Sequence, residues 1–278
     1  MVFQYKKVLL IGATSGIGAA MADRLVEAGV HVIAVGRRQE RLDAFVQKHG
    51  AQKTSAVQFD ITDASNLPSF VSKILRDFPD LDSVFLNAGT QSPYRLSQPE
   101  HVDLGRFHDE VHTNFTSIVN LAMAFLPHLQ AKDVPTSLIF TGTNICVVPA
   151  VTVPAYSASK AALNAFVYCL RAQSESAHKR TKIIEIWPPV VKSSYSPKFA
   201  LKKCEIHDYM GIERGRSMGM PADAFADEVF GRMEAGEEEI IVGTVGSPDM
   251  TGLFRELVAD RKTIFDGLSR MMLAHFEL

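Results

Sequence analysis

Short runs of apolar and β-branched residues alternate along the chain with longer segments whose apolar positions recur at helical spacing. Most of these runs are apolar throughout, which is typical of parallel strands covered on both faces. The segments between them are long enough for right-handed helical crossovers. The pattern predicts one α/β domain of the doubly wound, Rossmann type, with a seven-stranded parallel sheet and helices on both faces. The expected strands are residues 7–12, 30–36, 55–60, 83–88, 137–142, 182–187 and 239–243.

Two stretches depart from this alternation. Residues 192–220 are polar and contain glycine and methionine, so we expect a substrate loop with short helices, within a main unit of residues 1–248. Residues 249–278 form a C-terminal helical extension of the same domain, because apolar residues recur there in an imperfect helical stripe. Such a stripe is typical of a helix packed on its own domain or on a partner subunit; a membrane-surface role is disfavoured by the mixed charges beside it. The stripe consists of Leu253, Leu257, Ile264, Leu268, Met271 and Met272.

Composition and charge narrow the classes of function. A net charge of −2 over 278 residues gives no field that would recruit nucleic acid or an anionic membrane. Three scattered cysteines are too few for a disulfide framework, which favours a reducing, cytoplasmic setting. No apolar run reaches the ~18 residues of a membrane span, and the N-terminus lacks the pattern of a cleavable signal. We also predict no metal site, since the acidic residue of "HDEVH" (108–112) is displaced from the zinc motif H-E-x-x-H.

A glycine-rich loop, "GATSGIG" (12–18), follows the first expected strand and opens a helix. Glycines in this context allow a tight turn and let the backbone approach a diphosphate, which then binds the N–H groups at the helix N-terminus. The spacing is G-x-x-x-G-x-G rather than the G-x-G-x-x-G of other dinucleotide folds. The loop therefore indicates a dinucleotide cofactor.

The end of the second expected strand bears on which dinucleotide binds. A free ribose 2′-hydroxyl favours an acidic residue here, whereas the chain offers Arg37 and Arg38, which suit a 2′-phosphate. The alternative is that both arginines merely begin a solvated helix. We predict NADP(H) rather than NAD(H), with Arg37 as the better candidate. Asp60 and Ile61, after the third strand, are expected to border the adenine.

The stretch "PAYSASKAAL" (154–163) places Tyr156 and Lys160 one helical turn apart, on one face of a helix. An unperturbed tyrosine, with a pKa of about 10, is a reluctant base near neutral pH. A neighbouring ammonium favours the phenolate, so we expect Lys160 to lower the pKa of Tyr156. The small residues Ala158 and Ser159 leave room for a cofactor against this helix.

Together with "NAG" (87–89) and Asn114, these motifs resemble the classical short-chain dehydrogenase/reductase family, in the family's order and over most of the chain. The resemblance implies that Tyr156 is the acid/base of a hydride-transfer reaction, that Lys160 is its partner and also contacts the nicotinamide ribose, and that Asn114 holds a proton-relay water. It further implies a homodimer or homotetramer. The implied cofactor contacts are Gly12, Thr14, Ser15, Gly16, Ile17 and Gly18 at the diphosphate and Asn87, Ala88 and Gly89 beside the cofactor.

The sequence departs from the family pattern at two functional positions. Thr143 stands where the family has a substrate-orienting serine; it keeps the hydroxyl but its methyl narrows the pocket. Pro188-Pro189 replaces the usual Pro-Gly, which removes a flexible, N–H-bearing position. Val191 and Ser193 remain candidates to meet the nicotinamide carboxamide.

These observations predict an NADP(H)-dependent oxidoreductase that interconverts a carbonyl and a secondary alcohol on a mainly apolar small molecule. Two alternatives remain open. One, motivated by Thr143 and Pro189, is a non-redox isomerase or cyclase on the same fold, and the other is a binding protein that senses NADPH; the intact Tyr156–Lys160 pair argues against both. The residues expected to line the substrate pocket are Thr90, Gln91, Cys146, Val147, Phe199 and Met210.

Overall fold

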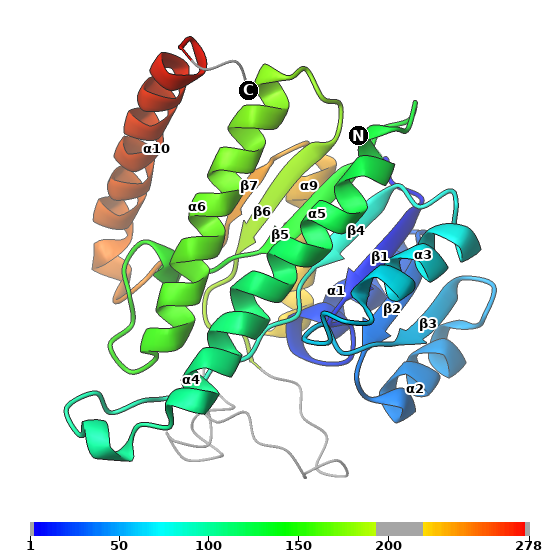
Figure 1. Ribbon diagram of the computed structural model, residues 1–278, viewed down its shortest axis with the longest axis horizontal. Helices are drawn as coiled ribbons and strands as arrows, with labels where there is room; N and C mark the ends of the chain where they lie inside the picture. Colours follow the sequence, from blue (N-terminus) through cyan, green and yellow to red (C-terminus); the bar gives the residue numbers. More distant parts are fainter. Residues whose placement is uncertain (1–2, 193–218, 276–278) are drawn as a thin grey trace.

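The computed structural model describes residues 3–192 and 219–275, which form a single α/β domain around a seven-stranded parallel sheet (Figure 1). The strand order is β3-β2-β1-β4-β5-β6-β7. All seven predicted strands are present, with ends within two residues of the expected ones. They are β1 (Lys7–Ile11), β2 (His31–Gly36), β3 (Thr54–Gln58), β4 (Ser83–Leu86), β5 (Ser137–Thr141), β6 (Lys182–Trp187) and β7 (Glu239–Ile241).

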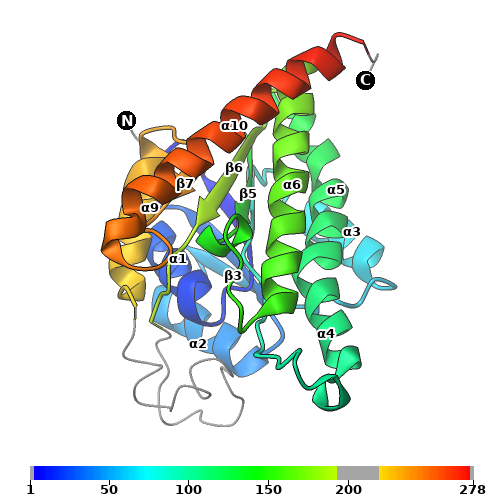
Figure 2. The same ribbon diagram turned by 90° about the vertical axis from the view of Figure 1, so that its left-hand side faces the viewer.

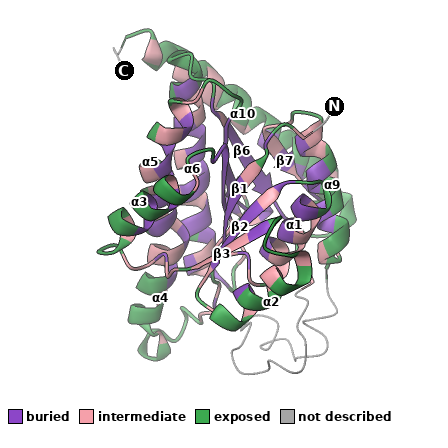
Figure 3. Cartoon of the chain, turned by 90° about the vertical axis from the view of Figure 1, so that its right-hand side faces the viewer, coloured by how far each residue is buried: buried purple, intermediate pink, exposed green. Residues whose placement is uncertain are grey.

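Helices cover both faces of the sheet, as predicted (Figure 3). One face carries α1 (Gly16–Glu27), α2 (Gln39–His49) and α9 (Ala222–Glu234), and the other carries α3 (Leu67–Asp77), α5 (Ser117–Gln130) and α6 (Pro154–Ser176). The helix α4 (Leu104–Val111) precedes α5, and the last helix is α10 (Thr251–Leu273). Short 3₁₀ turns lie at Pro99–His101, Asn144–Cys146 and Pro248–Met250, and a π-helical turn lies at His112–Thr116.

The side chains of β1 point alternately to the two faces of the sheet, and the apolar core accordingly forms two layers, one on each face. Val8 and Leu10 of β1 join the cluster under α1 and α9, whereas Leu9 and Ile11 join the cluster under α3, α5 and α6. Successive side chains of a strand point to opposite faces, so a strand covered on both sides must be apolar at every position. This is why the strands read as continuous apolar runs.

The topology fixes where a ligand is expected. The chain builds β1, β2 and β3 outward, then crosses back so that β4 pairs with β1 on its other side. In open α/β sheets the crevice outside the carboxyl ends of the strands at this switch point is the usual ligand site. The predicted cofactor and catalytic motifs follow these same strand ends.

The C-terminal helix α10 runs obliquely across the outer side of the β6–β7 edge, from α9 toward α6 (Figure 2). It packs through Phe254 and Val258, which join a small cluster with Trp187. The helix was predicted, but the stripe does not pack on the helix's own domain; packing on a partner subunit stays a prediction. All six stripe residues, from Leu253 to Met272, are exposed. None of the helices among residues 3–192 and 219–275 is long and apolar enough to cross a membrane.

Candidate active site

The glycine loop packs tightly against the segment that follows β4. Gly12 has φ +88°, and a Cβ at this position would lie 2.7 Å from the backbone of Ala88. A Cβ on Gly18 would overlap the carbonyl oxygen of Gly12. Both positions therefore require glycine. The loop Gly12 to Gly18, with Thr14, Ser15, Gly16 and Ile17 between, lies at the N-terminus of α1, where backbone N–H groups suit a diphosphate.

Asn87 ties three strand ends together beneath this loop. Its Nδ2 donates a hydrogen bond to the carbonyl oxygen of Gly12 (3.1 Å), and its Oδ1 accepts one from Oγ1 of Thr141 (3.0 Å). Gly89, two residues on, is exposed, and a Cβ there would come within 3.2 Å of Oδ1 of Asn114. The "NAG" segment therefore connects the glycine loop to the catalytic residues, and its small residues leave an open face above them.

The arginines after β2 are arranged differently from the prediction. Arg37 is exposed, with Nη1 3.6 Å from Oδ2 of Asp60. Arg38 instead reaches over the glycine loop, where Nη2 donates to Oγ1 of Thr14 (2.8 Å) and Oγ of Ser15 (2.9 Å). Arg41, which the sequence analysis did not single out, donates to the carbonyl oxygen of Thr14 (3.1 Å). Its spacing of three residues from Arg38 on the first turn of α2 was the signal that could have found it.

Tyr156 and Thr143 face each other between α6 and the turn after β5. The Thr143 side chain interacts with the phenol and favours its ionised form, but burial of Tyr156 outweighs this and raises its pKa above the ordinary value of 10.0. The charge of Glu110 raises it further. The expected lowering of this pKa by Lys160 is therefore wrong for the described structure. Nζ of Lys160 lies 5.8 Å from the centroid of the tyrosine ring and is directed to another partner.

Lys160 is buried, and its Nζ donates a hydrogen bond of 2.6 Å to the carbonyl oxygen of Thr141, the last residue of β5. Burial lowers its pKa from 10.5 to about 8, and the negative charge of Glu185 opposes that shift. Tyr156 and Lys160 thus share one face of α6, as their spacing predicts, and the lysine is fixed by the strand end that leads to Thr143.

Asn114 is fully buried in the π-helical turn between α4 and α5. Its side chain accepts a hydrogen bond from the N–H of Thr90 (2.8 Å) and donates to the carbonyl oxygen of Thr90 (2.7 Å) and to Oγ of Ser159 (3.2 Å). Single π-helical turns inside helices occur frequently at functional sites. Asn114 therefore fastens the loop after β4 to α6 beside the Tyr156–Lys160 pair.

Two buried carboxyl groups lie near these residues and were missed by the sequence analysis. Glu110 of α4 is 1% exposed, and among the described residues its Oε1 has no hydrogen-bond partner. Its position one helical turn before Asn114 was a usable signal. Glu185 of β6 is fully buried, and a polar residue inside an otherwise apolar strand was equally visible in "KIIEIW".

The remaining predicted residues lie around this centre. Ile61 is buried and Pro188 is buried at the end of β6, whereas Val191 forms an isolated parallel bridge with Met220. Cys146 is buried, which raises the pKa of its thiol and leaves it a small apolar side chain. Thr90 is exposed, and Gln91 and Val147 are partly exposed. Ser193, Phe199 and Met210 lie outside the described residues.

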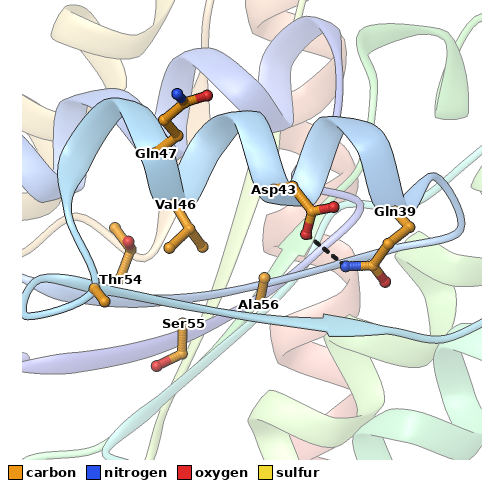
Figure 4. A pocket seen from close by; sticks show the side chains of 8 residues that line it. Gln39, Asp43, Val46, Gln47, Thr54, Ser55 and Ala56 are labelled. Atoms are coloured by element: carbon orange, nitrogen blue, oxygen red, sulfur yellow. Dashed lines mark hydrogen bonds between the residues drawn. The ribbon is translucent and has the colours of Figure 1, made fainter.

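Two surface hollows of the described chain lie away from this centre. One, of about 580 Å³, lies between α2 and β3; Figure 4 shows Gln39 of α2 donating to Asp43 there (2.7 Å). The other, of about 590 Å³, is lined by residues of α9, β7 and α10. Within the described ranges, no group of three or more His, Cys, Asp or Glu side chains could hold a metal ion. Neither hollow contains the groups of a catalytic centre.

Fold and site together define a dinucleotide-binding domain with a half-buried tyrosine one helical turn from a buried lysine. The chain belongs to the short chain dehydrogenase family, whose model matches residues 6–203. It is 31% identical over 191 residues to an uncharacterized oxidoreductase, DltE, of Bacillus subtilis, covering 69% of this chain and 73% of that protein. It is 33% identical over 195 residues to a fatty acyl-CoA reductase of Acinetobacter baylyi (68% and 63%). It is also 30% identical over 190 residues to a serine 3-dehydrogenase of Agrobacterium fabrum (68% and 73%).

Solved structures show the same fold. A short-chain dehydrogenase/reductase from Burkholderia phymatum in complex with NAD superposes with a TM-score of 0.77 at 16% identity, over 92% of this chain and 93% of the other. An alcohol dehydrogenase from the archaeon Thermococcus sibiricus, complexed with 5-hydroxy-NADP, superposes with a TM-score of 0.68 at 21% identity, over 87% and 98%. The family is one of oxidoreductases that bind a nicotinamide cofactor, and its fold is found with both nucleotides.

Proposed function

We propose that this protein is an NADP(H)-dependent oxidoreductase that interconverts a carbonyl and a secondary alcohol on a mainly apolar small molecule. The observation that carries the proposal is the grouping of buried Thr143 and Lys160 with half-buried Tyr156, beside Asn114 and at the strand ends that also carry the glycine loop. The glycine loop suits a dinucleotide. Gly12 and Gly16 have positive φ angles, and the loop carries no side chain at these positions, so its backbone N–H groups at the N-terminus of α1 can approach a diphosphate closely.

The nicotinamide, when bound, supplies or accepts the hydride. In reduction, negative charge develops on the carbonyl oxygen of the substrate, and the Tyr156 hydroxyl donates a proton to it; in oxidation the phenolate accepts that proton. The Thr143 hydroxyl orients the same oxygen. Lys160 shares one face of α6 with Tyr156, and its ammonium, held at the carbonyl oxygen of Thr141, would contact the nicotinamide ribose beside the phenol. Asn114 completes the relay at the base of the site.

The preference for NADP(H) rests on the arginines. Arg38 and Arg41 converge on Thr14 at the glycine loop, and Arg37 lies next to Asp60. A ribose 2′-phosphate in this region would find guanidinium groups that pair well with a dianion. The cluster favours the phosphorylated cofactor, with Arg38 now the better candidate and Arg37 the second.

An apolar substrate is favoured by Cys146 and Val147 beside Thr143. The names of the relatives fit a carbonyl or alcohol substrate but differ widely, from a fatty acyl-CoA reductase to a benzil reductase of Saccharomyces cerevisiae. We further propose a cytoplasmic homodimer or homotetramer, as the family resemblance implies. The extension at residues 249–278 then belongs to the same domain as residues 1–248.

The test is a panel of carbonyl compounds with NADPH labelled with deuterium at C4, followed by absorbance of NADPH and by mass spectrometry of the product. The panel contains a long-chain aldehyde, an aromatic 1,2-diketone and a small charged aldehyde, and Tyr156→Phe serves as the blank. Deuterium in the alcohol product supports the proposal. A new product without label would instead establish a non-redox enzyme, and tight NADPH binding with no product would favour a sensor.

A further inference from the structure

A polar stripe on helix α6 continues beyond the catalytic pair. Tyr156, Lys160, Asn164 and Tyr168 recur every four residues and therefore share one face of the helix. Asn164 is fully buried and Tyr168 is 4% exposed. A helix face that packs on a sheet is normally apolar, because a buried polar group costs free energy unless it is hydrogen-bonded. The stripe therefore needs partners, and strand β6 and helix α10 provide them.

The first partner is Glu185 of β6. Its Oε2 accepts a hydrogen bond from Nδ2 of Asn164 (2.8 Å), one turn along α6 from Lys160. Its Oε1 lies beside Gly142, where an added Cβ would come within 2.6 Å of it, and the Trp187 side chain on the same strand lowers the pKa of this carboxyl by hydrogen bonding although no well-aligned bond to Oε1 forms. Gly142 stands between Thr141, whose carbonyl oxygen binds Lys160, and Thr143. Oε1 of Glu185 thus lies directly beside the backbone that positions two catalytic side chains.

The second partner is Arg261 of α10. Its Nη1 donates to Oδ1 of Asn164 (2.6 Å), and its guanidinium carbon lies 5.1 Å from the centroid of the Tyr168 ring. An arginine can only donate hydrogen bonds, so it fixes the amide of Asn164 with its oxygen outward and its NH₂ group toward Glu185. Arg261, Asn164 and Glu185 therefore form a directed chain of hydrogen bonds from α10 to the floor of the site.

We propose that Glu185 is a positioning residue for Lys160: its carboxylate, held by Asn164 and Arg261 beside Gly142, keeps the Lys160 ammonium charged and directed at the end of β5. This inference rests on the proposed function, in which Lys160 assists Tyr156. A buried carboxyl group is a poor source of stability by itself, since its desolvation offsets much of what its contacts contribute. A charge opposite Lys160 gives this buried carboxyl group a role that stability alone does not.

The electrostatics of the site agree with this role. Burial raises the pKa of Glu185 to about 7 and lowers that of Lys160 to about 8, so both groups are largely charged between these values. The other charged or titratable groups that face Glu185 come from each neighbouring element. They are Arg171 on α6, Glu239 on β7, Arg261 on α10, and Cys146 and Tyr168 as uncharged titratable groups.

The experiment removes the charge and keeps the shape. Glu185→Gln retains an acceptor for Asn164, and the titration of Lys160 is followed by NMR of protein labelled with ¹³C-lysine, the signal being assigned with Lys160→Arg. In Glu185→Gln we expect the midpoint of the Lys160 titration to move to lower pH by about one unit, because the nearby negative charge that favours the ammonium is lost. The alkaline limb of kcat/KM should move equally, which lowers kcat/KM at pH 8 about fivefold.

Glu238→Gln is the matched control, because the Glu238 carboxylate pairs with Lys182 (3.1 Å) and takes no part in the chain from Arg261 to Glu185. Arg261→Met, which leaves Glu185 in place, should give a smaller shift in the same direction and provides the test if Glu185→Gln does not fold. An unchanged Lys160 titration in either folded variant overturns the proposal. The titration requires no turnover, so a protein that titrates as expected but reduces no carbonyl overturns the proposed function alone.

Discussion

The proton-transfer groups and the arginines after β2 lie at the same edge of the sheet but are held in opposite ways. Lys160 and Asn114 are buried, with hydrogen bonds of 2.6–3.2 Å to backbone and side chains. Arg37 is exposed, and its contact with Asp60 is 3.6 Å long. A buried polar group destabilises the fold if its hydrogen-bond partner is lost, whereas an exposed ion pair contributes little to the free energy of unfolding. In the proposed function the first region would therefore hold the reacting groups rigidly, and the second would set the cofactor preference with little effect on stability.

The largest effect should come from the buried region. Tyr156→Phe removes the proton donor without changing the ring, and we expect kcat to fall about 10³-fold, within the range for a lost general acid. NADPH affinity, measured by fluorescence titration, should change less than about threefold, because the change leaves the glycine loop intact. Tyr5→Phe, at another buried tyrosine, is the control. Retention of near-wild-type turnover by Tyr156→Phe would remove the contrast between the two regions.

The glycine loop joins the two regions, and Gly18→Ala tests how rigid that junction is. The added Cβ meets the Gly12 carbonyl oxygen and the Asn87 amide, so the loop must shift. We expect NADPH affinity to fall at least about tenfold and the free energy of unfolding to fall by about 1–3 kcal/mol. Gly231→Ala, in α9 with open space around it, should be neutral or slightly stabilising in the same denaturant titration. If Gly18→Ala and Gly231→Ala had the same NADPH affinity and the same free energy of unfolding, the close packing at Gly18 would not matter for cofactor binding.

Cofactor preference should respond to the arginines after β2, of which Arg38 is partly buried against the glycine loop and Arg37 is exposed. Replacing Arg38 by alanine removes a charge-assisted contact worth about 1.5–3 kcal/mol, so the Kd for NADPH should rise about tenfold or more. The Kd for NADH should change less than about threefold, since NADH carries no 2′-phosphate. Arg37→Ala is the comparison variant, and it should raise the Kd for NADPH less than Arg38→Ala does. Equal weakening of both cofactors by Arg38→Ala would show that this arginine only supports the glycine loop.

The smallest effect concerns the pH profile. The charge of Glu110 raises the pKa of Tyr156, so Glu110→Gln should lower that pKa. In alcohol oxidation the phenolate is the active form, and the rising limb of kcat against pH should therefore move to lower pH. Asp109→Asn, on the exposed side of the same helix, should leave the profile unchanged. A shift to higher pH in Glu110→Gln would show that Glu110 acts on Tyr156 in some other way.

The sequence predicted the elements whose residues carry a strong local signal. The seven strands were visible because both faces of the sheet are covered, and the motifs around Tyr156 and Gly12 have fixed spacing. It did not predict contacts that depend on how helices pack. Arg41 meets Thr14 because α2 folds back over the loop, and α10 packs through Phe254 rather than through Leu253. The tyrosine pKa was wrong in direction because burial, which exceeds the effect of a neighbouring charge, cannot be inferred from spacing.

The bridge between Val191 and Met220 joins two points of the described chain that are far apart in the sequence. The N–H of Lys192 donates to the carbonyl oxygen of Met220, and the N–H of Met220 donates to that of Val190. Because the ends are joined by the domain itself, doubling the length between them adds only about 0.6 kcal/mol of closure entropy. The free energy of unfolding should therefore depend only weakly on how many residues the chain has between positions 192 and 219.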